Sequence, residues 1–331
     1  MTALRVLCGS CAVLGAAHAE EASASRPVHT YSIVARDAKT GQLGVAVQSH
    51  WFSVGSLVTW AEAGVGAIAT QSFVDPAYGP RGLYLMRSGL GAPDALKALL
   101  GADAGEAVRQ VAFVDSQGRV AAHTGSKCIE SAGHHAGKAY SVQANMMRND
   151  RVVPAMHRAY EGAKGDLAER LLSTLEAAEA AGGDVRGRQS AALLVVKGEN
   201  TGRPWADRVV ELRVEDHADP LVELRRLLTV HRAYDHMNQG DLAVEKGDMA
   251  GALRHYQAAA KLAPGNVEMV FWHAVALSTK GRVEEAVPLF RKVFEKDATW
   301  ADLLGRLHKP GIIPDTPEGR ALVERILKEA R

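Results

Sequence analysis

The C-terminal third of the chain contains an internal repeat, and this repeat constrains the fold more than any other feature of the sequence. Residues 233–266 align without a gap to residues 267–300, at a period of 34 residues. The matched positions are Gly247 with Gly281, Ala252 with Ala286, and Tyr256 with Phe290. A repeat of this length is one supersecondary unit, which buries its apolar face only against the next unit. We therefore expect stacked helix pairs in this region.

The first copy resembles the tetratricopeptide repeat, a pair of antiparallel helices. It matches the pattern at Gly240, Ala252, Tyr256, Ala259 and Pro264, and the second copy departs from it at Ala274 and Ala298. Two repeats are too few to stand alone. We therefore expect residues 218–232 to form a helical connector and residues 301–331 to cap the end, with a helix starting at Pro317. The resemblance implies a protein or peptide partner in the concave groove, and a generic helical hairpin is the alternative.

Length and charge exclude several classes of function. The chain has 331 residues, which suits two domains, and 47% of them are hydrophobic. Lys and Arg total 39 against 38 Asp and Glu, so the sequence lacks the basic surface that nucleic-acid binding needs. No apolar run reaches the length of a membrane helix. We expect neither a nucleic-acid partner nor a membrane span.

The N-terminus reads as a targeting segment. Residues 1–19 combine Arg5, a short apolar run and the small-x-small motif that ends at Ala19, which together predict a cleaved signal peptide. The sequence therefore predicts export to a periplasm or the exterior. Residues 20–29 are small and polar, and we expect a disordered lead-in there.

After cleavage at Ala19 the chain would keep one cysteine, Cys128, so no internal disulfide is predicted. We interpret Cys128 as a buried, inert residue. The alternative is a nucleophile beside His134 and His135. These two histidines lack the i, i+4 spacing with a Glu that marks a zinc helix, and the sequence predicts no metal site.

Between residues 30 and 217, strands come first, then helices, then strands, helices and strands again. Hairpins are predicted at residues 30–50 and around Ser116–Gly118. Helical spacing is predicted over residues 78–103, in two pieces that are broken at Gly89–Pro93. A third helical stretch ends at Gly182 and Gly183, where a left-handed C-cap fits. This order favours a layered α+β fold over alternating βαβ units. No G-x-G-x-x-G motif links a strand to a helix, so no cofactor is predicted.

Three segments carry a second resemblance: "TYSIVARDAKTGQLGVAVQSHWFSVG", "GVGAIATQSFVDPAYGPRG" and "GGDVRGRQSAALLVV". They resemble the bacterial domain of unknown function 1028, over roughly residues 30–217. That family is grouped with the N-terminal nucleophile hydrolases, whose fold is a four-layer αββα sandwich. The resemblance therefore implies an α+β sandwich, followed here by the all-α tetratricopeptide-like segment.

The resemblance also gives Thr30 a role. In that superfamily the first residue of the mature chain attacks an amide carbonyl, and its own α-amino group, with a pKa near ~8, acts as the base. Thr30 matches that position. Cleavage at Ala19 leaves residues 20–29 ahead of it, so Thr30 becomes a nucleophile only after the His29–Thr30 bond is cut. The alternative is that Thr30 simply begins a strand, where β-branched residues are favoured.

Other polar residues interrupt apolar runs and predict a cleft. The candidates are Asp37, Gln48, Ser49, Gln71, Asp75, Tyr78, Arg81, Asp184, Arg186, Gln189 and Ser190. A buried polar group needs a hydrogen-bond partner, so each of these either fastens the sheets or lines the cleft. Ser190 lacks the G-x-S-x-G motif of a conventional serine nucleophile.

Two hypotheses follow for the function. The first is an exported amide or peptide hydrolase that uses Thr30 after processing. The second is a catalytically silent sandwich that binds or assembles partners through its tetratricopeptide segment. Sheet edges can pair between copies, so a homo-oligomer is compatible with both.

Overall fold

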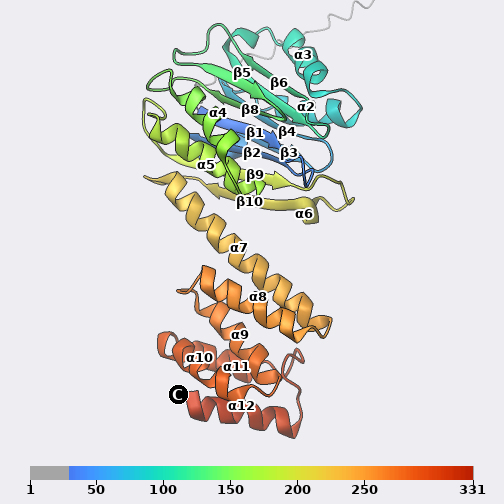
Figure 1. Cartoon of the computed structure of the whole chain (residues 1–331), viewed down its shortest axis with the longest axis vertical. Helices are drawn as coiled ribbons and strands as arrows, with labels where there is room; N and C mark the ends of the chain where they lie inside the picture. The colour runs from blue at the N-terminus through green and yellow to red at the C-terminus, as the bar shows by residue number, and fades with distance from the viewer. Residues whose placement is uncertain (1–29, 331) are drawn as a thin grey trace, which may run out of the picture.

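The computed structural model describes residues 30–330. The predicted signal peptide, the lead-in and the His29–Thr30 bond lie outside the described residues. Figure 1 shows a sheet-containing part above a helical part, with one long helix between them. The chain is therefore a mixed helix-and-sheet domain followed by a helical segment.

The larger sheet has six antiparallel strands in the order β10-β9-β2-β1-β8-β7. They are β1 (Thr30–Arg36), β2 (Leu43–Ser49), β7 (Gly133–Gly137), β8 (Tyr140–Ala144), β9 (Ser190–Val196) and β10 (Arg208–Val214). β1 and β2 form the predicted hairpin. The Asp37 carboxylate fixes its turn by accepting the backbone N–H groups of Lys39 and Thr40, and Gly41 supplies a φ of 72°.

The smaller sheet has four strands in the order β3-β4-β5-β6. They are β3 (Thr59–Glu62), β4 (Gly66–Ser72), β5 (Arg109–Asp115) and β6 (Val120–Thr124). The predicted hairpin around Ser116–Gly118 joins β5 to β6 and is confirmed. Strand β7 in the larger sheet is not foreseen by the sequence analysis. Its residues, GHHAG, are partly exposed and lack an apolar alternation.

The two sheets pack face to face, with helices on both outer faces. Val34, Val45 and Val47 of the larger sheet meet Ala67 and Ala112 of the smaller one. The helices are α2 (Tyr78–Arg87) and α3 (Ala92–Ala102) on the smaller sheet, and α4 (Val152–Gly162) and α5 (Leu167–Ala180) on the larger. Short elements α1 (Gly55–Val58), η1 (Glu106–Val108) and α6 (Pro204–Asp207) lie in the connections. Burial of these apolar faces drives the layering.

Helix α7 (Pro220–Glu245) joins the two parts and has 26 residues. Leu224 and Leu228 pack into the core beneath the larger sheet, whereas Ala233 and Met237 pack within the helical part. The helix is continuous through residues 232–233, where the predicted connector meets the predicted first repeat. One helix therefore belongs to both cores.

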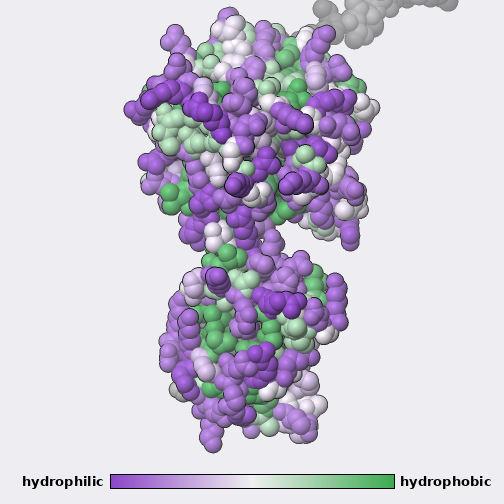
Figure 2. All heavy atoms as spheres, viewed as in Figure 1, coloured by the Kyte–Doolittle hydropathy of each residue, from purple (hydrophilic) through white to green (hydrophobic). Residues whose placement is uncertain are grey.

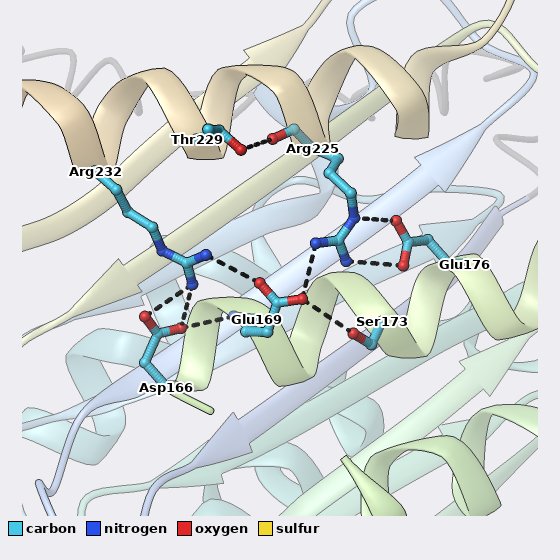
Figure 3. Close-up of polar contacts among 7 residues, drawn as sticks. All are labelled: Asp166, Glu169, Ser173, Glu176, Arg225, Thr229 and Arg232. Carbon is cyan, nitrogen blue, oxygen red and sulfur yellow. Dashed lines mark hydrogen bonds and ion pairs between the residues drawn. The ribbon is translucent and has the colours of Figure 1, made fainter. Parts of the chain in front are cut away.

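A network of ion pairs fastens α7 to α5 (Figure 3). Arg225 donates two hydrogen bonds to the Glu176 carboxylate, at 2.5 and 2.8 Å, and one to Glu169 at 2.8 Å. Arg232 donates to Glu169 at 3.0 Å and to Asp166 at 2.9 Å. Partial burial raises the pKa of Glu169, but the two guanidinium groups outweigh it, so the net shift is downward. Because these groups are partly exposed, we assign the network to orientation more than to stability.

The helical part confirms the two repeats. The second half of α7 pairs with α8 (Met249–Leu262), and α9 (Val267–Thr279) pairs with α10 (Val283–Lys296). Helices α11 (Thr299–Gly305) and α12 (Pro317–Ala330) follow, and α12 packs on α10. The aligned turn glycines, Gly247 and Gly281, have nearly equal φ values of 76° and 75°. The repeat in the sequence is thus a repeat in the backbone.

The Gly240 position shows why the pattern needs a small residue. A Cβ built there would lie 2.5 Å from Cε1 of Tyr256, whose buried ring donates its hydroxyl to Asp241 at 2.6 Å. We predict that Gly240→Ala lowers the free energy of unfolding by about 1–2 kcal/mol, because the clash outweighs the better helix propensity of alanine. Thermal denaturation followed by circular dichroism measures this.

The matched control is Gly305→Ala, at a helical glycine whose Cβ would meet no atom within 4 Å. This variant should be neutral or slightly more stable. Equal effects of the two substitutions would contradict the packing role of Gly240.

Candidate functional site

One end of the space between the sheets is polar, whereas the rest of it is apolar. Thr30, Ser49 and Ser190 lie side by side on β1, β2 and β9, since the strand register pairs Thr30 with Ser49 and Ser49 with Ser190. All three are fully buried. The Thr30 hydroxyl donates to Oγ of Ser49 at 3.3 Å. The strands thus bring three predicted site residues into one row of hydroxyls.

The facing sheet contributes Gln71 from β4 and Gln110 from β5. The side-chain amide of Gln71 donates to the backbone carbonyl of Thr30 at 3.2 Å and to Oε1 of Gln110 at 2.7 Å. Its own carbonyl oxygen accepts from Oγ of Ser32 at 2.6 Å. Gln71 therefore ties the two sheets together at the start of β1.

Strand β8 and the residue after it close the network. Gln143 donates to Oγ of Ser32 at 2.6 Å, and Ser141 donates to Gln143 at 3.0 Å. Asn145 donates its backbone N–H to the carbonyl of Thr30 at 3.1 Å and its side-chain amide to Gln110 at 2.9 Å. Donors from β4 and from the residue that follows β8 thus hold the Thr30 carbonyl, which fixes the backbone of this residue.

Backbone strain gathers at the same end. Among residues 30–330, five non-glycine residues have a positive φ. Four of them lie at this end of the sandwich. Ser72 is the last residue of β4, and Ser53, Ser131 and Met146 lie in the connections that follow β2, precede β7 and follow β8. Each such conformation costs on the order of 1–3 kcal/mol and is typical of functional sites. The clustering marks this end of the sandwich as the candidate site.

Loops around Asp184 form the rim. The buried Asp184 carboxylate accepts the backbone N–H of His50 at 3.3 Å and pairs with Arg186 at 2.7 Å. Gln189 donates its backbone N–H to the carbonyl of Ser49 at 3.2 Å. The Ser190 hydroxyl accepts from the backbone N–H of Val54 at 3.1 Å. These contacts fasten the rim to the ends of β2 and β9.

The other predicted residues lie away from Thr30 or hold local turns. Asp37 is at the opposite end of β1, where it also pairs with Arg170 at 3.1 Å. Asp75 accepts the N–H of Ala77 at 2.9 Å just before α2. Tyr78 donates to Asp103 at 3.0 Å, and burial together with that carboxylate raises the pKa of Tyr78. Arg81 is exposed on α2.

Gln48 points to the other face of the larger sheet. It sits between Tyr31 and Ala191 in the register, two residues that belong to the core under α4 and α5. Its side chain is fully buried, and neither amide atom has a hydrogen-bond partner among residues 30–330. Tyr31 beside it donates to Glu179 at 2.7 Å. Gln48 is therefore separate from the Thr30 network.

The Cys128 thiol and the His134 ring each make a local hydrogen bond. Cys128 donates to the carbonyl of Arg109 at 3.3 Å, and burial raises the pKa of its thiol, which disfavours the thiolate. Burial lowers the pKa of His134, which contacts the Thr124 hydroxyl at 2.8 Å. Residues 30–330 contain no group of three or more His, Cys, Asp or Glu arranged to hold a metal. None of the helices they form has the length and apolar character needed to cross a bilayer.

The sequence analysis did not foresee five residues of the network. The missed residues are Ser32, Gln110, Ser141, Gln143 and Asn145. The signal was present, because Ser141, Gln143 and Asn145 alternate at i, i+2 and i+4 along a strand, which places them on one face. Polar residues in that alternation, facing a second sheet, indicate a buried polar layer.

Comparisons with known proteins agree with this architecture. Residues 30–224 match the model of a family of unknown function, DUF1028, and residues 243–307 match a tetratricopeptide repeat model. The chain belongs to the DUF1028 family. It is also similar to a crystal structure of a DUF1028 protein from Silicibacter pomeroyi, with 32% identity and a TM-score of 0.54, over 60% of this chain and 84% of that one. No curated protein matches the chain.

The two buried glutamines give a paired prediction. Gln71→Met would remove one hydrogen bond from each of Ser32, Gln110 and the Thr30 carbonyl. We therefore expect the free energy of unfolding to fall by about 2–3 kcal/mol. Gln48→Met removes a buried amide that has no partner, and we expect stability to rise by about 1 kcal/mol. Urea denaturation of both variants measures the difference.

Both substitutions conserve side-chain volume, so packing changes are matched. Destabilisation of the same size in both variants would show that the Gln71 contacts do not hold the sheets together.

Proposed function

We propose that the sandwich domain is an N-terminal nucleophile amide hydrolase, exported with signal cleavage near Ala19, in which Thr30 becomes the nucleophile once the preceding residues are removed. The observation that carries the proposal is the position of Thr30. It is the first residue of β1, its side chain faces the space between two sheets, and its carbonyl is held by Gln71 and Asn145. The helix-covered pair of sheets supports an αββα sandwich of this superfamily.

The chemistry needs two groups on one residue. A free α-amine of Thr30 would take the proton from its own hydroxyl as Oγ attacks the amide carbonyl, and would return it to the leaving nitrogen. The acyl group would then sit on Oγ as an ester, and water would release it as the carboxylic acid. Amide donors of Asn145 and Gln71 already fix the Thr30 backbone, so the nucleophile is oriented before the substrate arrives.

While residue 29 precedes it, the Thr30 nitrogen is an amide and cannot act as a base. The Thr30 side chain is also fully buried. The proposal therefore requires removal of the preceding chain to create the base, and a movement of the surrounding side chains to admit a substrate.

A second candidate function rests on a different observation. The repeats suggest protein interaction, and α7 fixes them to the sandwich through the Arg225 and Arg232 ion pairs. In this alternative the sandwich is catalytically silent and the chain is a binding or assembly module.

The hydrolase proposal predicts a mature chain that starts at Thr30 and is acylated there by an amide-mimicking β-lactone. Intact-mass analysis of protein secreted from its host should show loss of residues 1–29, and the β-lactone should add one adduct. Thr30→Ala should abolish the adduct, whereas Thr30→Ser should retain it, because serine keeps the hydroxyl and the amine.

The matched control is Thr174→Ala, which removes another fully buried threonine. It lies on α5, far from β1 in the sequence, and its hydroxyl donates to the carbonyl of Arg170. This variant should label normally. A stable mature chain that keeps residues before Thr30 would contradict the hydrolase proposal and leave the binding module as the function.

A further inference from the structure

The two repeats form a groove with apolar walls. It encloses about 460 Å³ between the second half of α7, α9 and the loop before α12. One wall is a face of α9 that carries Trp272, Val275 and Thr279. Val244 of α7 lines the same groove. Figure 2 shows hydrophobic surface gathered over the helical part, while the visible face of the sheet domain is mostly hydrophilic.

The loop between α11 and α12 supplies the far wall. Ile313 is fully buried in the helical core, whereas Ile312 lines the groove and is 43% exposed. His308 contacts the carbonyls of Ile313 and Pro314 at 3.3 and 3.2 Å. Ile313 therefore anchors the loop in the helical core, and Ile312 lines the groove.

The charged residues that line this groove are both acidic. Of the ten described residues that line it, Asp241 and Glu245 are carboxylates and none is Lys or Arg. Asp241 is held in place by the Tyr256 hydroxyl at 2.6 Å. Within residues 30–330, neither carboxylate forms an ion pair. Two carboxylates therefore line an apolar groove, and neither forms an ion pair with another described residue.

We propose that this groove binds a basic apolar peptide segment of a partner protein, with an aliphatic side chain against Trp272 and Ile312 and a flanking Lys or Arg at Asp241 and Glu245. The inference deepens the binding role within the proposed function and rests on it. Burial of an aliphatic side chain against these walls lowers the free energy of binding. A neighbouring cation would be attracted to the two carboxylates, which form no ion pair with the described residues. An acidic peptide would meet like charge there.

Fluorescence anisotropy with the full chain and three labelled probe peptides tests the proposal. The probes carry Lys-Leu-Leu-Lys, Glu-Leu-Leu-Glu or Lys-Ser-Ser-Lys between Gly-Ser flanks. We expect the first to bind best, and its affinity to fall as salt rises, because ions screen exposed charges. Glu245→Lys and Ile312→Ser should each weaken binding of the first probe by roughly fivefold or more.

Two controls match these variants. Glu295→Lys reverses an exposed carboxylate on α10, and Leu242→Ser removes an α7 side chain of 44% exposure that does not line the groove. Both should bind the first probe as the unmodified chain does, and circular dichroism should show all four variants folded.

Preference for the acidic probe, no binding of any probe, or equal affinity of Glu245→Lys and Glu295→Lys would each overturn the inference. None of these results bears on the start of the mature chain at Thr30. Failure of the groove is therefore distinguishable from failure of the hydrolase proposal.

Discussion

The hydrogen bonds of Gln71 are the interaction on which the sandwich end depends. Two sheets that pack through valine and alanine need no polar contact, and most of their interface has none. At the start of β1 the interface changes, and the Gln71 amide reaches Thr30, Ser32 and Gln110. Each of these buried groups costs free energy if left alone, so the network holds only as a whole.

The same strand end connects to the helical part by a short series of contacts. Tyr31, the residue after Thr30, donates to Glu179 on α5, and Arg188 lies 3.6 Å from that carboxylate. Arg188 also pairs with Asp219, which directly precedes α7. With the Arg225 pairs, these contacts fix the direction of α7, and α7 carries the repeats. A partner bound in the proposed groove would therefore be held at a set position relative to the sandwich.

The sequence predicts the features that depend on residues close together in the chain. The hairpins, the C-cap at Gly182 and Gly183, and the repeats are confirmed, because turn glycines and apolar periods report them directly. The candidate site was found only in part. Ser49 and Ser190 were named, but Gln110 and Asn145 were not, since their importance arises from two sheets meeting face to face. Gln48 is a candidate because it is polar within an apolar run. Side chains alternate along a strand, however, so Gln48 lies on the face of the larger sheet that packs under α4 and α5.

If Thr30 supplies its own base, its α-amino group must be unprotonated near neutral pH, and the pKa of that amine decides this. A chain produced to start at Thr30, with that nitrogen labelled with ¹⁵N, can be titrated by NMR. Neutral amides and hydroxyls surround the residue, and burial disfavours a charged amine. The account predicts a pKa below the usual value of about 8. An amine that stays protonated well above pH 8 would contradict it.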